Sequence, residues 1–355
     1  MKIKVLLPVL LAALLTCGFN NLPSSMSFRV AKPKLIVDDK VTISFVGDCT
    51  LGSYKGSDDA FGKYYKKYGS SYFLSHAKEI FDKDDITFAN LEGPLTKNPQ
   101  VLEKKFSMRG DPDYVSILKD GSVEVVNLSN NHIYDCGDVG FNDTINVLDE
   151  NNIAFCGENK RCMFSVPVKD FKYGGLIPGT SKYKYVNVCF LGYKGWEDTK
   201  SLRDTITKDI KDAKECGADI ICAEFHWGEE RENYPNKVQQ DLAHFAIDSG
   251  CDVVVGAHPH VLQGIEKYNG KVIAYSLGNF CFGGNKNPSD KDTMILQVTF
   301  DTGCNMSSVD VIPYKISTSD TINDFSPNTR NNLTTRKILD RINEYSKDFK
   351  DHFTF

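Results

Sequence analysis

The chain has 355 residues, 41% of them hydrophobic, with a formal net charge of -5 and a pI near 5.8. Its lysines and arginines form no cluster of the kind that a phosphate backbone requires, so a nucleic-acid partner is excluded. Large α/β folds reach this length as one unit, and no Pro/Ser-rich linker or internal repeat divides the chain. We therefore expect one main domain.

Residues 1–20 have the composition of an export signal. Lys2 and Lys4 precede an apolar run over Val5–Leu15, which is too short to cross a membrane comfortably as a mature helix. The protein is therefore expected to be exported and to lie at the extracytoplasmic face of the cell membrane.

The mode of anchoring is left open by the same segment. The stretch Leu14–Cys17 resembles a bacterial lipoprotein signal, in which Cys17 carries the lipid, although Thr16 is unusual before an acceptor cysteine. Ordinary cleavage and an uncleaved anchor are the alternatives. Residues 21–40 have no sustained periodicity and are predicted to be a tether to the membrane.

From residue 41 to 315 the sequence alternates between strand and helix patterns. The predicted strands include 41–47, 85–90 and 123–128, and the predicted helices include 71–81, 111–119, 202–216 and 238–249. Two helix–strand units in series, ending at His226 and His258, imply parallel strands joined by right-handed crossovers. Both histidines are therefore expected at the same edge of one sheet.

Five apolar runs end in side chains that bind metals or transfer protons. These runs are Ser44–Asp48, Ile86–Glu92, Val125–His132, Ile220–His226 and Cys251–His260. Because ligands bind at the carboxyl ends of strands in open α/β sheets, the five endings can converge on one site. Taken singly, each has an ordinary interpretation as a turn, a capping residue or a solvated loop side chain. The functional interpretation depends on their combination.

The last of these runs carries two imidazoles around a proline. An alternating spacing in an extended segment sends the side chains of His258 and His260 apart, so each can reach a different ion. This stretch predicts a pair of metal sites. Two surface histidines beside Pro259 are the alternative.

The chain has eleven cysteines, none spaced as C-x-x-C, which argues against zinc fingers and thioredoxin-type centres. Several lie within apolar runs and are expected to be buried thiols. A disulfide between Cys49 and Cys136 is a weaker alternative. Residues 316–355 form a polar extension with a helix predicted near 333–349, which either packs on the domain or stays mobile.

Six motifs in order resemble a known family. They are Gly47-Asp48, Asn90-Leu-Glu92, Asn130-Asn-His132 with Asp135 and Gly137, His226-Trp-Gly-Glu229, Gly256-Ala-His-Pro-His260 and Ser276-Leu-Gly-Asn-Phe280. Together they are similar to bacterial capsule-synthesis proteins of the CapA type. That family is associated with poly-γ-glutamate capsules and belongs to the calcineurin-like metallophosphoesterase superfamily. The resemblance covers roughly Val41 to Tyr314.

The resemblance implies an α/β/β/α four-layer sandwich with metals at the strand ends. By motif, one ion is held by Asp48, Glu92 and His260, and the other by Glu92, Asn131, His226 and His258. Imidazole, carboxylate and amide oxygen together suit one or two Mn, Fe or Zn ions better than Mg or Ca.

The same resemblance implies roles for three further residues. His132 is the free imidazole that protonates the leaving oxygen, with Asp135 as its partner. Arg109 is a candidate clamp for an anionic substrate, and an ordinary surface arginine is the alternative.

One departure from the superfamily divides the functional hypotheses. Ordinary binuclear phosphoesterases carry Asp-x-His in the first motif, whereas Asp48-Cys49-Thr50 has no histidine. The first hypothesis is a metal-dependent hydrolase acting on capsule polymer or on its phosphorylated or amide-linked intermediate. The second is a non-catalytic, membrane-tethered accessory subunit that works with membrane-bound capsule synthase subunits.

Overall fold

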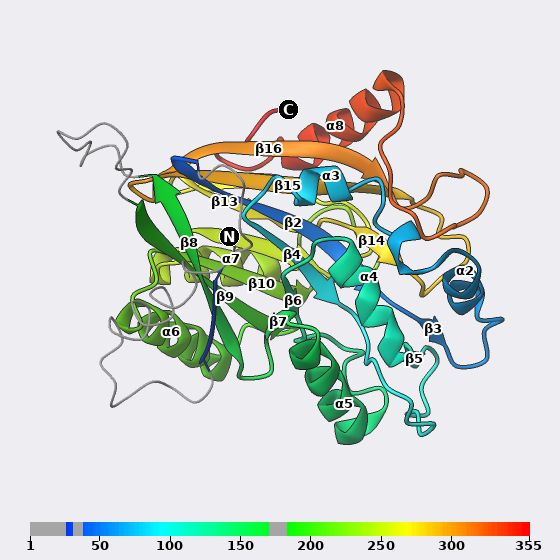
Figure 1. The fold of residues 1–355 in the computed structure, drawn as a ribbon. Coiled ribbons are helices and arrows are strands. Elements are labelled where there is room, and N and C mark those ends of the chain that lie inside the picture. Colours follow the sequence, from blue (N-terminus) through cyan, green and yellow to red (C-terminus); the bar gives the residue numbers. More distant parts are fainter. Residues whose placement is uncertain (1–25, 31–37, 170–182) are drawn as a thin grey trace, which may run out of the picture.

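The computed structural model describes residues 26–30, 38–169 and 183–355. Two mixed β-sheets pack face to face, with helices on the outer face of each (Figure 1). The expected signal segment and Cys17 lie outside the described residues. Among the helices that the structure describes, none is long and apolar enough to cross a membrane.

The first sheet, sheet A, is mostly parallel in its centre. Its strands in spatial order are β1 (Met26–Val30), β8 (Arg161–Lys169), β9 (Tyr183–Gly195), β10 (Ile220–Trp227), β11 (Val253–Ala257), β13 (Lys271–Ala274) and β12 (Ile265–Tyr268). Strands β9, β10, β11 and β13 run parallel. His226 pairs with Ala257, the residue before His258, so the expected common edge is confirmed.

The second sheet, sheet B, carries the N-terminal motifs. Its strands in order are β16 (Met306–Lys315), β15 (Asp292–Asp301), β2 (Lys40–Thr50), β4 (Ile86–Leu91), β6 (Val125–Asn127) and β7 (Ala154–Cys156), with β14 (Asn279–Phe282) also paired to β2. Strands β2, β4, β6 and β7 are parallel, so their carboxyl ends share one edge.

Helices complete the four layers. Sheet B is covered by α2 (Ala60–Tyr68), η1 (Ser70–Tyr72), α3 (Lys78–Phe81), η2 (Pro112–Tyr114), α4 (Val115–Asp120) and α5 (Gly137–Glu150). Sheet A is covered by α6 (Lys200–Glu215) and α7 (Lys237–Ser249). The α/β/β/α sandwich predicted from the resemblance is confirmed.

Capping side chains and glycines define the ends of the two helices on sheet A. Thr199 and Asn236 precede α6 and α7, and their side chains accept hydrogen bonds from backbone N–H groups of the first turn. Gly217 and Gly250 follow the helices with φ values of 84° and 122°, which residues with a Cβ rarely adopt. Each helix therefore stops where the next strand must begin.

The core between the sheets follows strand alternation. In β10, Ile220 and Cys222 belong to the inter-sheet core, whereas Ile221 and Ala223 pack under α6 and α7. Every second residue of a strand therefore faces the other sheet. The polar side chains at the ends of these inner rows meet across the gap.

Two boundary expectations change. The tether predicted over 21–40 is corrected for Met26–Val30, because this segment pairs in parallel with β8 at the edge of sheet A. The helix predicted over 71–81 is interrupted, since only η1 and α3 are helical there.

The C-terminal segment packs on the domain. Helix α8 (Asn332–Ser346) lies against β12 and β16, and buries Ile338 and Ile342 in the inter-sheet core (Figure 1). The cysteines among the described residues are all free thiols, so Cys49 and Cys136 form no disulfide.

Candidate metal centre

The predicted ligands meet at one end of the sandwich. Sheet B delivers the oxygen donors, which are Asp48 in β2, Glu92 directly after β4 and Asn131 after β6. Sheet A delivers the nitrogen donors, which are His226 in β10 and His258 and His260 directly after β11. The site therefore forms only where the two sheets face each other.

A bulge in β2 brings Asp48 to this end. Phe45 faces the inter-sheet core, and strict alternation would turn Asp48 to the opposite face. The pairing with β4 shifts register between Val46 and Asp48, which returns the carboxylate to the inner face. Gly47 lies in this bulge, and a Cβ there would be 1.8 Å from the carbonyl oxygen of Gly278.

The side chains form two groups that share one carboxylate. Asp48, Glu92 and His260 can each offer an atom within 4.8 Å of the others, and so can Glu92, His226 and His258. His258 and His260 belong to different groups, as their spacing predicts. Glu92 belongs to both groups.

The two oxygens of Glu92 have different surroundings. Oε2 accepts a hydrogen bond of 2.6 Å from the Thr50 hydroxyl, whereas Oε1 is buried without a hydrogen-bond partner. Oε1 lies 3.9 Å from Nε2 of His132 and of His226, and 3.8 Å from Nε2 of His260. These separations are too long for hydrogen bonds. The separations from His226 and His260 leave room for an ion between Oε1 and each of these two imidazoles, whereas His132 lies outside both ligand groups.

The two histidines after β11 have an unusual backbone. His258 and His260 have φ values of 95° and 57°, a conformation that costs roughly 1–3 kcal/mol for a residue with a side chain. The N–H of His258 donates to Asp48 Oδ2 at 3.3 Å, and Asn279 Nδ2 donates to the His260 carbonyl at 3.2 Å. Nδ1 of His258 is buried without a partner. These hydrogen bonds hold the strained backbone conformation, and that conformation directs both rings into the site.

Burial and charge divide the imidazoles into two protonation types. Burial lowers the pKa of His226 far below its ordinary value and that of His258 to about 4, which leaves both rings as neutral ligands. Burial also opposes the charge of His260, but Glu92 and Asp48 outweigh it and raise its pKa to about 10. The hydrogen bond and charge of His260 in turn outweigh burial at Asp48 and lower its pKa to about 2.

His132 is oriented from behind by a carboxylate. Its Nδ1 lies 2.7 Å from Asp135 Oδ2, which also accepts the N–H of Met108 at 2.6 Å. Lys104 Nζ is 2.5 Å from Asp135 Oδ1. The other ring nitrogen of His132 faces Glu92 Oε1. This arrangement leaves one imidazole nitrogen free at the edge of the two groups.

Other residues complete the site although the sequence assigned them no role. Asn90 Nδ2 donates to Asp48 Oδ1 at 2.7 Å and lies 3.3 Å from His226 Nδ1. Asn279 Oδ1 lies 2.8 Å from Nδ1 of His260. Both asparagines belong to the motifs that carry the family resemblance, so those motifs could have identified them as site residues. Lys104 comes from a loop with no motif.

Asn131 and Arg109 are the two predicted site residues that are exposed. The amide oxygen of Asn131 is 2.9 Å from His226 Nε2, although Asn131 itself is exposed. Arg109 lies on β5 (Met108–Arg109), where its guanidinium donates to the carbonyl of Asn98 at 3.0 Å. Arg109 therefore does not join the two ligand groups.

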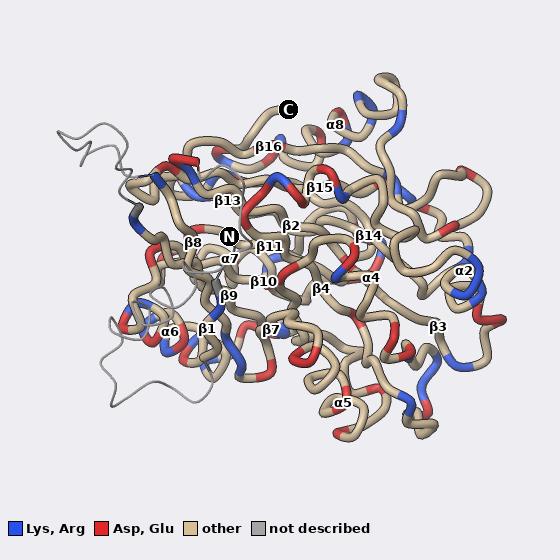
Figure 2. The backbone as a smooth tube through the Cα atoms, viewed as in Figure 1, with Lys and Arg blue, Asp and Glu red and all other residues tan. Residues whose placement is uncertain are grey.

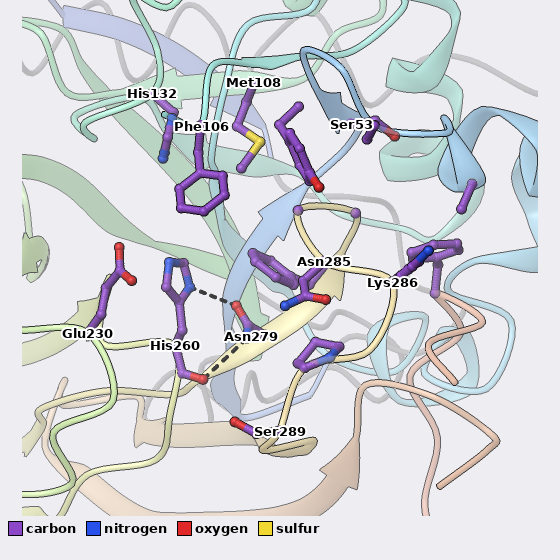
Figure 3. Close-up of a pocket in the computed structure, with 18 of the residues that line it drawn as sticks. Ser53, Phe106, Met108, His132, Glu230, His260, Asn279, Asn285, Lys286 and Ser289 are labelled. Atoms are coloured by element: carbon purple, nitrogen blue, oxygen red, sulfur yellow. Dashed lines mark hydrogen bonds between the residues drawn. The ribbon is translucent and has the colours of Figure 1, made fainter. Parts of the chain in front are cut away.

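A cavity of about 410 Å³ opens beside the groups. Figure 3 shows His132 and His260 on one side of this cavity, with Phe106 between them and Lys286 at the far side. Arg109 does not line this cavity. The cavity next to His132 can therefore hold a part of a ligand that extends beyond the atoms at the ligand groups.

Sequence comparison identifies the family. The family model of the bacterial capsule synthesis protein PGA_cap matches residues 42–284. The chain belongs to this family. It therefore belongs with the CapA-type capsule biosynthesis proteins, as its motifs predict.

Two relatives extend the PGA_cap match. The chain is 34% identical over 265 residues to the PGA biosynthesis protein CapA of Bacillus subtilis (strain 168), covering 71% of this chain and 66% of that protein. It is 30% identical over 299 residues to the capsule biosynthesis protein CapA of Bacillus anthracis, covering 81% and 70% respectively. About a third of each relative's length is thus outside the match.

Solved structures are more distant. A novel phosphatase from Mycoplasma pneumoniae has a TM-score of 0.42 at 14% identity, covering 78% of this chain and 94% of that one. A 5'-nucleotidase from Candida albicans SC5314 has a TM-score of 0.43 at 12% identity, covering 89% and 60%.

Proposed function

We propose that this PGA_cap protein is a metal-dependent hydrolase that acts on a phosphorylated or amide-linked intermediate of capsule formation. The observation that carries the proposal is Glu92, whose unpartnered Oε1 lies between two groups of ligands. A buried carboxylate oxygen without a hydrogen bond is costly unless a cation compensates it.

The residues fit a transition metal. Each group combines carboxylate oxygen with imidazole nitrogen, a donor set that suits Mn, Fe or Zn. The unpartnered Nδ1 of His258 is a second buried atom that an ion would satisfy. A bound ion would polarise an oxygen of the substrate and lower the pKa of a coordinated water.

His132 is the proposed acid. Asp135 holds Nδ1, so Nε2 is the nitrogen that exchanges protons with the leaving oxygen. The ion pair with Lys104 keeps the Asp135 carboxylate in place and helps it to orient the ring. The cavity beside His132 then receives the leaving group.

The proposed setting is outside the cell membrane. The support is the export signal and possible lipid site in residues 1–20, together with the capsule functions in the names of two relatives. We propose that the N-terminus holds the domain at the membrane, near capsule synthase subunits.

A second candidate function has one observation in its favour. The first group contains Asp48, Glu92 and His260, and Thr50 occupies the position of the histidine in ordinary phosphoesterases. Thr50 orients Glu92 in place of binding an ion. A weakly occupied first group would suit a non-catalytic accessory subunit of a capsule synthesis and export complex.

Metal content and turnover test the proposal together. Purified wild type is compared with His226→Ala, His132→Ala and the exposed control His76→Ala, by elemental analysis and by hydrolysis of bis(p-nitrophenyl) phosphate with Mn, Fe or Zn. We expect His226→Ala to lose metal and turnover, and His132→Ala to keep metal but lose roughly 10²–10⁴-fold in rate. Wild type that holds no metal and hydrolyses nothing would favour the accessory subunit.

Tryptophan fluorescence gives an independent measure of metal binding. Of the two tryptophans, Trp196 is exposed with its ring 4.6 Å from that of His258, whereas Trp227 is buried. We expect Mn²⁺ to quench Trp196, and Trp196→Phe to abolish most of the change. A quench that persists in His226→Ala would argue against binding at this group.

A further inference from the structure

A second cavity of about 500 Å³ adjoins the first. A two-stranded ribbon separates them, in which Ser53 of β3 (Ser53–Tyr54) pairs with Arg109, and Tyr54 pairs with Met108. Successive residues of a strand point to opposite sides. Met108 accordingly lines the first cavity, and Arg109 lines the second.

The two cavities meet at the turn after β3. Ser53, Tyr54, Gly56 and Ser57 line both of them. A Cβ added to Gly56 would meet no atom within 4 Å, so the space above the turn is open. An elongated ligand can therefore pass from the first cavity, beside His132, across this turn into the second.

The second cavity carries three cations. Lys55, Lys97 and Arg109 are exposed and line it, and basic positions lie around β3 in Figure 2. In the part of the chain that the structure describes, none of the three forms an ion pair. One N–H of the Arg109 guanidinium donates to the Asn98 carbonyl, and its other N–H groups remain available to a ligand.

The two carboxylates of the second cavity are already engaged. Asp59 accepts hydrogen bonds from the N–H of Gly62 at 3.1 Å and from the Ser53 hydroxyl at 3.0 Å. Asp111 accepts the N–H of Asp113 at 3.0 Å. Both acids thus cap the starts of helices and form no ion pair with the three cations, which outnumber them by one in this cavity. The cavity therefore favours an anion.

We propose that the second cavity is a subsite for an acidic group, carboxylate or phosphate, carried by the same chain whose reacting group lies at the metal ligands. The proposal rests on the proposed function of the metal centre, and adds that the substrate is elongated and acidic away from the reacting bond. It also assigns Arg109 to a remote group of the substrate and not to the reacting one.

Binding of short acidic probes tests the subsite. Dye-labelled tetraglutamate is titrated with the full chain by fluorescence anisotropy, with tripolyphosphate as a competitor and tetraglutamine as the neutral probe. The variant Lys55→Gln/Lys97→Gln/Arg109→Gln is compared with Lys83→Gln/Lys211→Gln/Lys237→Gln. The second variant loses the same net charge from exposed lysines elsewhere on the surface.

We expect the cavity variant to bind tetraglutamate about tenfold more weakly or worse, because charge-assisted hydrogen bonds are lost, and the control to bind like wild type. Competition by tripolyphosphate that fails in the cavity variant would identify phosphate as a ligand of the same subsite. Equal weakening of both variants, or equal binding of tetraglutamine, would overturn the proposal. Melting temperatures check that the variants fold.

A metal-site variant separates this proposal from the proposed function. His226→Ala removes a ligand of the second group but no residue of the second cavity. We expect it to bind tetraglutamate with unchanged affinity. If hydrolysis proves absent while the cavity variant still loses tetraglutamate, the subsite stands without the catalytic role. If hydrolysis is found and the cavity variant binds tetraglutamate like wild type, the catalytic role stands and the subsite proposal is overturned.

Discussion

The two sheets contribute different chemistry to the same site. Sheet B supplies carboxylate and amide oxygens, and sheet A supplies imidazole nitrogens. Each ligand group contains members from both sheets. An ion bound in either group would therefore join the two sheets at the open end of the sandwich, and its binding energy would add to the stability of the fold.

The sheets also hold their donors differently. On sheet B, neighbouring side chains orient the carboxylates, since Thr50 donates to Glu92 and Asn90 donates to Asp48. On sheet A, the backbone does this through the left-handed conformations of His258 and His260. A buried carboxylate needs hydrogen bonds or a cation to remain charged, whereas an imidazole ligand must have its ring directed toward the ion.

The shared carboxylate provides the largest test of this division. Glu92→Gln removes the one charge common to both groups, so we expect metal content to fall at both sites. Hydrolysis should fall by about 10³-fold or more. His260→Ala is expected to remove only one ion. Elemental analysis of both variants is compared with the exposed control Glu79→Gln.

An unchanged metal content in Glu92→Gln would contradict the bridging arrangement. Equal losses in Glu92→Gln and His260→Ala would mean that the two groups bind as one unit. Either result would contradict the view that the site holds two separate ligand groups that share Glu92.

The bulge of β2 tests how sheet B reaches the site. A Cβ at position 47 would lie 1.8 Å from the carbonyl oxygen of Gly278, so we expect Gly47→Ala to destabilise the fold by about 3 kcal/mol. Gly270→Ala is the control, because Gly270 has φ 76° but open space for a Cβ, and should cost about 1 kcal/mol. Urea unfolding measures both. Equal costs would show that close approach is unimportant.

The smallest effect is expected where α8 fastens sheet B. Arg341 binds Asp290 at 2.6 Å and also contacts Asp292. Burial opposes the charge of Asp290, but the Arg341 hydrogen bond outweighs it and lowers the pKa below the ordinary 3.8. This stabilisation is present above pH 3.8 and is lost as the pH falls through the lower folded value.

Arg341→Gln is therefore expected to cost about 1–2 kcal/mol at pH 7 and less at pH 3. Urea unfolding at both pH values measures the difference. Arg336→Gln on the same helix removes an exposed pair and should cost under about 0.5 kcal/mol. A penalty for Arg341→Gln that does not shrink at pH 3 would mean that Arg341 acts through packing.

Strand periodicity and motif order alone predicted much of this protein. The parallel helix–strand units that end at His226 and His258 follow from apolar patterns, and the four-layer sandwich follows from the family resemblance. The glycines after α6 and α7 are local signals of the same kind, because left-handed backbone favours glycine. These are local properties, so a single sequence carries them.

Other features depend on contacts between distant segments, which only the tertiary structure decides. Alternation would have turned Asp48 away from the site, and the bulge at Gly47 turns it back. Met26–Val30 looked like a tether because its pattern is weak, yet it completes an edge of sheet A. Arg109 and Met108 are neighbours in sequence, but a strand sends them into different cavities. Strand register, bulges and the side of a strand to which each side chain points all depend on the neighbouring strand. That strand comes from a distant part of the chain, so no single segment encodes them.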